Sequence, residues 1–393
     1  MPPRRDLSWQ SVALGAQRDS SAPLSDLLSL PPAGTRALSS GYLPADLQPT
    51  KLLAGALGRA ARRPGVWDRI PVEGVEALRA WFARDLGSGI GAHDVIICPG
   101  TQAALACAFR ALAQPGSAIV VESPTYLGAL AAARAADLQI TAVPADADGV
   151  RTDLLDDAFA SSGARLFYGQ PLYANPHGGV LSSSRRGEVL SLLDSHGAFM
   201  IEDDWARDLS LRTRPPAPLA TEDDHGHIVY VRSLSKPAAP GLRIGCLAAR
   251  GPVAARLRAA RVVEDFFVAG PLQEGALEIV GSPAWHRHLR SLSGTLRERR
   301  DALVGSIGRY LPALEIAAVP DGGLHLWAEL PEGTDEEELT RAALRAGVVV
   351  SSGRHWFPTE APAPFLRLTY AAAPPDELEA ATRALAEVMA SLG

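Results

Sequence analysis

The stretch VRSLSKPAAPGLRIG, residues 231–245, places Lys236 among small hydroxyl-bearing residues and Arg243 seven positions later. Between them, Pro240 and Gly241 form a turn signal that stiffens the backbone. A lysine on an ordinary surface needs none of these neighbours. A lysine that does covalent chemistry must lose its proton, and burial and neighbouring cations both favour that loss. The stretch therefore indicates a reactive lysine with an arginine fixed close to it.

Short apolar runs that alternate with helix-like segments surround this stretch. The runs lie at 94–100, 118–123, 138–145, 164–171, 198–204, 227–233 and 243–249. Fully apolar runs of this length imply strands that are covered on both faces, as in a mainly parallel sheet. An amphipathic helix is expected at 74–87, with Gly87 as its stop. The fold class predicted is α/β.

The pattern changes after about residue 285. A long charged helix is expected at 288–311, followed by strand-like segments at 322–330, 346–353 and 365–371 and by a last helix. These elements predict a second, smaller α/β domain. We therefore expect an arm at 1–40 with one short helix, a large domain at 41–280 and a small domain at 281–393.

Composition narrows the class of protein. The 393 residues are 47% hydrophobic and 21% charged, with a net charge of −6, so neither a nucleic acid nor an anionic membrane is expected as a partner. No stretch is apolar for long enough to span a membrane, and no secretory signal begins the chain. The three cysteines fit no metal-ligand spacing and indicate a reducing compartment, the cytoplasm.

The residues of chemical interest lie at the expected exits of strands, where open parallel sheets bind ligands. Thr101 and Gln102 begin a helix whose amides offer an anion site, although an ordinary helix cap explains them equally. Asp203 is one of three acids that end an apolar strand. Without histidines at ligand spacing we expect no metal there, and a carboxylate in that place can hold a protonated ring nitrogen.

Three further features complete the pattern. Asn175 lies in the constrained turn YANPHGG, and Arg367 lies inside the apolar strand FLRLTY, where a guanidinium needs an anion or an internal salt bridge. Ser233, Ser235 and Arg243 can all face one phosphate near Lys236. Lysine, phosphate clamp, carboxylate and asparagine together indicate a site for pyridoxal phosphate.

With these residues in place, the sequence resembles the class I and II aminotransferases, pyridoxal-phosphate enzymes of fold type I. Within them it is similar to the branch of 2-aminoadipate and kynurenine aminotransferases and the aminotransferase-like domains of MocR-type regulators. The matching motifs are GYLPADLQP, PGTQAAL, ESPTYLG, ANPHGG, IEDD, SLSKPAAPGLRIG, GGLHLW and LRLTY, in the family's order between residues 40 and 375. The resemblance implies a three-layer α/β/α large domain with a seven-stranded sheet, and a homodimer.

The resemblance also implies roles for residues. Lys236 would form the internal aldimine and move the proton at the substrate α-carbon, Asp203 would pair with the pyridinium nitrogen, and Arg367 would bind the α-carboxylate of an amino acid. Residues that would contact the cofactor in other ways are Tyr126 and Trp205 beside the ring, Asn175 at its phenolic oxygen, and Thr101, Gln102, Ser233, Ser235 and Arg243 around the phosphate.

The sequence departs from the family pattern at three places. Trp205 and Ala206 stand where a tyrosine usually bonds the phenolic oxygen. Trp67 and Arg69 are the candidates for a residue that reaches the partner subunit's phosphate, where the family has tyrosine. Tyr42 stands where the branch usually has a glycine beside the substrate.

The leading function expected is an aminotransferase acting on an α-amino acid. Because an indole can neither ionise nor accept a hydrogen bond, Trp205 leaves open a lyase, replacement enzyme, oxidase or decarboxylase on the same scaffold, with a role in specialised metabolism. A third reading is a regulator that binds the cofactor without turnover. It requires a DNA-binding domain, and the residues before 41 show no basic face or helix-turn-helix pattern.

Overall fold

The computed structural model describes residues 7–14, 22–87, 89–212 and 214–392. Its strands are β1 Arg36–Ala37, β2 Val95–Cys98, β3 Ala118–Ser123, β4 Gln139–Asp146, β5 Gly149–Val150, β6 Leu166–Gly169, β7 Phe199–Asp204, β8 Ile228–Ser233, β9 Gly245–Ala248, β10 His325–Glu329, β11 Val348–Val349, β12 Ser351–Ser352 and β13 Phe365–Thr369. Its α-helices are α1 Trp9–Leu14, α2 Ala22–Leu28, α3 Thr50–Ala60, α4 Glu76–Leu86, α5 Thr101–Leu112, α6 Leu127–Ala135, α7 Thr152–Ser162, α8 Ser183–His196, α9 Pro252–Glu264, α10 Gly270–Val280, α11 Pro283–Tyr310, α12 Glu336–Arg345 and α13 Pro375–Leu392.

The large sheet has the strand order β2-β9-β8-β7-β6-β3-β4-β5. The four neighbouring pairs from β8 to β4 are parallel, whereas β9 runs antiparallel to both β2 and β8. The seven strands expected from the sequence are all present. An eighth, β5, pairs antiparallel with the end of β4 and has two residues, too few to leave a periodic signal.

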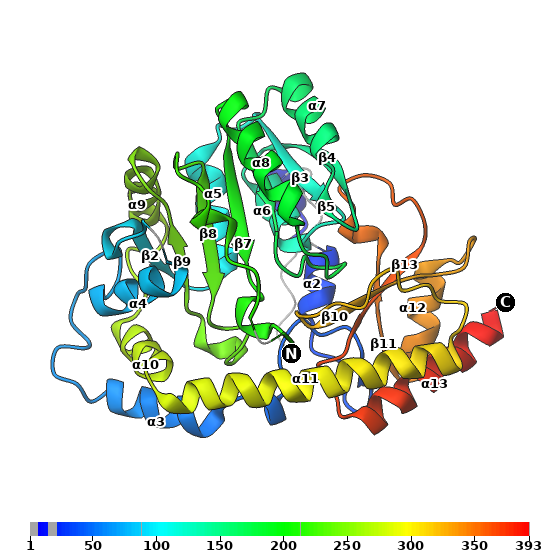
Figure 1. Ribbon diagram of the computed structural model, residues 1–393. Coiled ribbons are helices and arrows are strands. Elements are labelled where there is room, and N and C mark those ends of the chain that lie inside the picture. The colour runs from blue at the N-terminus through cyan, green and yellow to red at the C-terminus, as the bar shows by residue number, and fades with distance from the viewer. Residues whose placement is uncertain (1–6, 15–21, 88, 213, 393) are drawn as a thin grey trace.

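Alternation along the strands builds a core on each face of this sheet. In β7, for example, Met200 belongs to the core that α4, α7, α8 and α10 cover, whereas Ile201 belongs to the core under α5, α6 and α9. The same alternation separates Val120 from Val121 in β3. This is the three-layer α/β/α arrangement that the sequence predicted, and Figure 1 shows helices on both sides of the sheet.

A third core is built mainly from residues 292–388. Strands β10, β13 and β12 make an antiparallel sheet, and β1 pairs in parallel with β11. The helix α11 is 28 residues long and packs against α13; it crosses the base of the molecule in yellow in Figure 1. It begins five residues before the helix expected at 288–311, because Ser282 caps it and Pro283 occupies its first turn.

The amphipathic helix predicted at 74–87 is confirmed as α4, with Leu78, Phe82 and Leu86 buried and Gly87 ending it at a φ of 94°. The arm at 1–40 carries two short helices, α1 and α2, rather than one, and residues 1–6 and 15–21 of it lie outside the described part of the chain. The three-part division of the chain stays a prediction. Among the described residues no helix is both long and apolar enough to cross a membrane.

Candidate active site

Lys236 lies in the turn that follows β8, at the carboxyl end of the parallel strands. It is one of two lysines in the sequence, and the other, Lys51, is exposed on α3. The Nζ atom of Lys236 donates a 2.7 Å hydrogen bond to the carbonyl of Gly41 and lies 4.0 Å from the centre of the Tyr42 ring. Burial, followed by the charge of Arg367, lowers the pKa of Lys236 to about 7, against the opposing effect of Asp203. This amine can therefore lose its proton near neutral pH.

Three consecutive carbonyl groups of the chain before α3 accept hydrogen bonds from this region. Arg367 donates to Ser39 at 2.6 Å, His325 Nε2 lies 3.3 Å from the Ser40 oxygen, and Lys236 donates to Gly41. A Cβ on Gly41 would lie within 4.0 Å of Lys236 Nζ, Arg367 Nη1 and His325 Nε2. The segment 39–41 thus crosses the site, and the glycine that faces the donors is Gly41, with Tyr42 following it.

Arg367 reaches the site from β13 and is 1% exposed. Its Nη1 donates to Asn175 Oδ1 at 3.2 Å, and its Cζ lies 4.4 Å from the centre of the Trp356 ring. No carboxylate is among the partners of Arg367 in the described chain, and its Nε has no hydrogen-bond partner there. Burial lowers the pKa of Arg367 to about 9. The internal salt bridge considered as the alternative is absent from the described contacts, and the guanidinium has neutral acceptors instead.

The three acids at the end of β7 point to different faces because side chains alternate along a strand. Glu202 accepts from the backbone amides of Leu219 and Ala220, and Asp204 pairs with Arg207. Asp203 alternates with them, and its carboxylate accepts from Gln170, which also binds the backbone of Asn175 beside Arg367. The carboxylate that can act at the site is therefore Asp203.

Asp203 is held by neutral donors. Its Oδ2 accepts from the Tyr168 hydroxyl at 2.8 Å and from Gln170 Nε2 at 2.9 Å, whereas its buried Oδ1 has no partner. Burial raises the pKa of Asp203 to about 6, and the two hydrogen bonds oppose that rise. An orphaned carboxylate oxygen in this position can accept from a cationic N–H group.

Gln170 was missed by sequence reasoning. Besides binding Asp203 through Nε2, Gln170 accepts at its Oε1 from the backbone N–H of Asn175 at 2.8 Å, and its backbone N–H donates to Glu122 Oε2 at 2.9 Å. One side chain thus connects the β7 carboxylate to the turn that carries Asn175. The available signal was the polar pair Tyr168 and Gln170 at the end of an apolar strand, next to the strand that carries the acids.

The residues assigned to a phosphate meet where β2 and β8 end and the antiparallel strand β9 begins. Cys98, Gly245 and Ser233 are adjacent in register across these strands. Gly100, at a φ of +88°, precedes α5, and a Cβ there would lie 2.5 Å from Arg243 Nη2, so the arginine packs directly on the backbone. This brings Ser233 and Arg243 to the first turn of α5, where Thr101 and Gln102 carry amides free of intrahelical partners.

The side chains around the start of α5 differ in whether their polar atoms already have a hydrogen-bond partner within the protein. Ser235 Oγ is buried with no partner, whereas Arg243 Nη2 donates to the Pro99 carbonyl at 2.9 Å. Gln102 donates to the Gly128 carbonyl and accepts from the Tyr126 hydroxyl at 3.1 Å. The side chain of Gln102 therefore orients Tyr126, and it is its backbone amide that faces outward.

Trp205 is buried, and its indole N–H donates to the Tyr173 carbonyl at 3.1 Å. Its one donor is thus used by the backbone. The ring lies 5.9 Å from the His325 ring, centre to centre, and 5.7 Å from Lys236 Nζ. His325 is a second residue that sequence reasoning did not single out; it occupies an inward position of the apolar strand β10, and burial holds its pKa well below the usual value.

Trp67 and Arg69 lie away from this cluster. Trp67 is 73% exposed and donates to the Ala61 carbonyl, and Arg69 is also exposed. Neither residue contacts Lys236, Asp203 or Arg367 among the described interactions.

Comparison with known proteins identifies the family. Residues 70–385 match the sequence model of the aminotransferases of class I and II, so the chain belongs to that family. The 2-aminoadipate transaminase of Thermus thermophilus is 29% identical over 93% of this chain and 94% of its own length. A helix-turn-helix type transcriptional regulator of Bacillus subtilis, YisV, is 30% identical over 93% of this chain and 74% of its own length.

Similarity to solved structures supports the same family assignment. The structure of LysN, an α-aminoadipate aminotransferase of Thermus thermophilus bound to N-(5'-phosphopyridoxyl)-L-leucine, superposes with a TM-score of 0.91 at 27% identity and covers 98% of this chain and 99% of the other. The kynurenine aminotransferase of Pyrococcus horikoshii shares the fold, with a TM-score of 0.88 at 24% identity over 97% of this chain and 96% of the other. The protein is a fold type I, pyridoxal-phosphate-dependent aminotransferase.

The residues present fit this cofactor. The orphaned Asp203 Oδ1 offers an acceptor for a protonated ring nitrogen, and the orphaned Ser235 Oγ lies in the same loop as Lys236. At Gly245 a Cβ would come within 3.4 Å of the Thr101 amide nitrogen, so the lack of a side chain keeps the start of α5 open.

Proposed function

We propose that Lys236 carries the cofactor and that the site transaminates an α-amino acid whose carboxylate binds Arg367. The observation that carries this proposal is the pairing of a lysine whose pKa burial lowers to about 7 with a buried arginine that has no carboxylate partner in the described chain. When bound, pyridoxal phosphate supplies an electron sink for the charge that develops on the substrate α-carbon.

Arg367 would bind the substrate through exchange of acceptors. Its present acceptors, the Ser39 carbonyl and the Asn175 amide oxygen, are neutral, and a carboxylate is a stronger acceptor for a guanidinium and can take two parallel hydrogen bonds. The unpartnered Nε provides a further donor for that fork. As the substrate enters, Arg367 and Lys236 would release the carbonyl groups of Ser39 and Gly41. The ring of Tyr42 would cover the amine of Lys236.

Lys236 would hold or move the proton at the α-carbon, for which an amine near its own pKa at neutral pH is suited. Asp203 would keep a proton on the ring nitrogen through its free Oδ1, with Tyr168 and Gln170 fixing the other oxygen. Asn175 would bond the phenolic oxygen, and Tyr126 would cover one ring face in the orientation that Gln102 sets.

The phosphate would bind at the first turn of α5, to the amides of Thr101 and Gln102, with Ser233, Ser235 and Arg243 around it. A helix N-terminus favours an anion through its free amides and its dipole. Trp205 would contribute packing and not a hydrogen bond, since the Tyr173 carbonyl already takes its N–H. That assignment favours ordinary transamination over a lyase, replacement, oxidase or decarboxylase reaction.

A homodimer is the proposed assembly, with Trp67 or Arg69 entering the partner subunit's site. The exposure of both residues, with Trp67 at 73%, supports the idea. Sedimentation velocity of wild type and Arg69→Ala checks it, and a fully active monomer would contradict it. The three cysteines are free and buried, which supports the cytoplasm as the proposed location.

The test of the reaction is the absorption spectrum of the protein loaded with pyridoxal phosphate while single L-amino acids are added without any keto acid. An aminotransferase converts the band of lysine-bound cofactor to the pyridoxamine band and releases one equivalent of keto acid. Return of the original band while product accumulates would show a different fate of the substrate and would reject transamination.

A further inference from the structure

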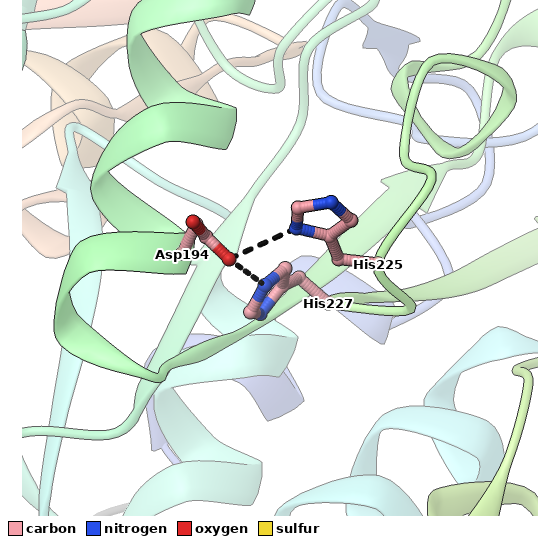
Figure 2. A group of neighbouring side chains, drawn as sticks. All are labelled: Asp194, His225 and His227. Atoms are coloured by element: carbon pink, nitrogen blue, oxygen red, sulfur yellow. Dashed lines mark hydrogen bonds and ion pairs between the residues drawn. The ribbon is translucent and has the colours of Figure 1, made fainter.

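Two histidines and an aspartate meet at the opposite end of β8 from Lys236. Asp194 lies in the last turn of α8, whereas His225 and His227 lie in the turn that leads into β8. Figure 2 shows both imidazole rings directed toward the Asp194 carboxylate. The Oδ1 atom of Asp194 lies 2.9 Å from His225 Nδ1 and 3.3 Å from His227 Nε2.

We propose that Asp194, His225 and His227 bind one divalent metal ion of the zinc class, which ties the end of α8 to the turn before β8. Imidazole and carboxylate are ligands that Zn²⁺ accepts, and the three ligand atoms lie within 4.8 Å of one another. Bonds of about 2.0–2.1 Å in a tetrahedron separate neighbouring ligand atoms by about 3.3 Å. Small side-chain adjustments therefore bring the three atoms around one ion, with water in the fourth position.

The tautomer of His227 is the strongest argument for a cation. Its Nδ1 lies 2.9 Å from the carbonyl oxygen of Ala198, and a carbonyl can accept but not donate, so Nδ1 carries the hydrogen. In a neutral ring, Nε2 then presents its lone pair to Asp194 Oδ1, which is itself an acceptor. Two acceptors 3.3 Å apart repel each other unless the ring takes up a second proton or a metal ion binds both atoms. A backbone carbonyl that fixes the second ring nitrogen is also the usual support of a metal-bound histidine.

The surroundings of the three ligands favour a cation as well. Asp194 stands at the carboxyl end of α8, where the partial negative charge of the helix end disfavours a carboxylate. The surface hollow that the cluster lines also contains Glu222, Asp223 and Asp224. Glu222 pairs with Arg186 and Asp223 lies 3.7 Å from Arg250, so a positive ion at this place would offset chiefly the charges of Asp194 and Asp224.

The turn that carries the histidines is already ordered. Asp223 is 6% exposed, and its carboxylate accepts from the backbone amides of His225, Gly226 and Ile228 at 2.9–3.1 Å. The backbone of His227 is in turn fixed to Met200 of β7. Little chain order is therefore lost when the ion binds, which favours affinity.

Sequence analysis expected no metal, and the reason lies in the separation of the ligands along the chain. His225 and His227 are two residues apart, but Asp194 precedes them by 31 and 33 positions. The parallel pairing of β7 with β8 brings the end of α8 beside the turn before β8.

The test is equilibrium dialysis of the cofactor-loaded protein against ZnCl₂, with bound zinc measured per chain. Wild type is expected to bind one equivalent. Asp194→Asn and His225→Ala are expected to lose that equivalent or to bind it at least about tenfold more weakly, since even residues that merely support a metal ligand change affinity by that factor. Zinc should also raise the melting temperature of wild type, and this rise should be absent in both variants.

His93→Ala is the matched control, because His93 forms a similar surface pair with Asp94 without a third ligand. It is expected to bind zinc as wild type does. The Asp194 and His225 side chains are 60% and 66% exposed, so both variants should fold, and each checks the other. A wild type that binds no zinc, or an equivalent that survives in both variants, would overturn the proposal.

Discussion

Arg232 and Arg367 are two buried strand arginines whose surroundings differ in one respect. Arg232 is 2% exposed and Arg367 is 1% exposed, and each guanidinium packs over a tryptophan ring, Trp81 and Trp356 respectively. Arg232 pairs with the carboxylates of Asp85 and Asp208, whereas Arg367 donates to a backbone carbonyl and an amide oxygen.

The comparison separates a structural cation from one that can bind an anion. The charge of Arg232 is balanced within the chain, so this residue can stabilise the fold but has no capacity for a ligand. The charge of Arg367 is solvated by neutral groups, and Lys236 is solvated in the same way by the Gly41 carbonyl. Burial lowers the pKa of Arg367 and Lys236 and also that of Arg232, so the partners of these groups, and not their pKa values, distinguish the two kinds of cation. Unbalanced buried cations therefore mark the site.

The largest expected effect follows from removing the unbalanced lysine. Lys236→Ala should lower turnover by more than about 10⁴-fold, because proton transfer and covalent attachment of the cofactor would both be lost. Borohydride reduction followed by mass spectrometry of peptides should label Lys236 alone. Lys51→Ala removes the other lysine of the chain and should leave labelling and turnover unchanged. Labelling of Lys51 in the wild type would contradict the assignment.

Replacing each arginine by methionine should affect activity in one case and stability in the other. Arg367→Met should lower kcat/KM for the amino acid about 10²-fold or more, since a charge-assisted fork is lost. Its effect on the free energy of unfolding should stay small, because the variant removes a buried charge that no acid balances and leaves only neutral acceptors without a donor. Arg232→Met should instead destabilise the protein by about 3–5 kcal/mol, because it leaves Asp208 buried without its partner.

Urea unfolding and steady-state kinetics of the two variants measure these effects together. Equal losses of stability in both variants would show that Arg367 is a structural residue and would reject its role at the carboxylate. Arg367→Lys keeps the charge without the planar fork and should recover part of kcat/KM.

The lysine should also make stability depend on pH in the protein freed of its cofactor. The pKa of Lys236 is about 7 in the folded state against an ordinary value of 10.5, so between these limits the unfolded chain binds more protons than the folded one. The free energy of unfolding of wild type should therefore rise as pH increases through this window. At pH 7 and below, Lys236→Met should be more stable than wild type by an amount on the order of a few kcal/mol.

That advantage should shrink toward pH 10.5, as thermal unfolding followed by circular dichroism across the window would show. A difference that is constant with pH would indicate that the lysine pKa is not lowered. Lys51→Met provides the comparison for an exposed lysine on the same chain.

The smallest effect is expected at Trp205. Trp205→Phe removes the hydrogen bond to the Tyr173 carbonyl and should cost about 1 kcal/mol of stability, with kcat changed by less than about threefold. A large change in kcat, or a shifted pH midpoint of the cofactor absorption, would show that the indole tunes the cofactor directly. The lyase, replacement, oxidase and decarboxylase reactions would then return to consideration.

Much of the fold could be predicted from the sequence because its signals are local. The seven strands follow from unbroken apolar runs and the helix α4 from periodicity, and the family motifs point to Lys236, Asp203 and Arg367 as candidates. The two-residue strand β5 and the early start of α11 could not be predicted in the same way. A strand of two residues has no period, and the cap Ser282 with Pro283 was not taken into account.

What the sequence alone determined is which residues stand at the ends of strands, since an apolar run followed by Asp203, Asn175 or Lys236 is a property of neighbouring positions. What only the tertiary structure decided is how the charges are balanced. The acids of Arg232 come from 147 and 24 positions earlier in the chain, Arg367 meets Ser39 across 328 positions, and Asp194 meets its histidines across a parallel crossover. Coulomb energy depends on distance in space and on burial, and neither quantity is encoded in the local order of residues.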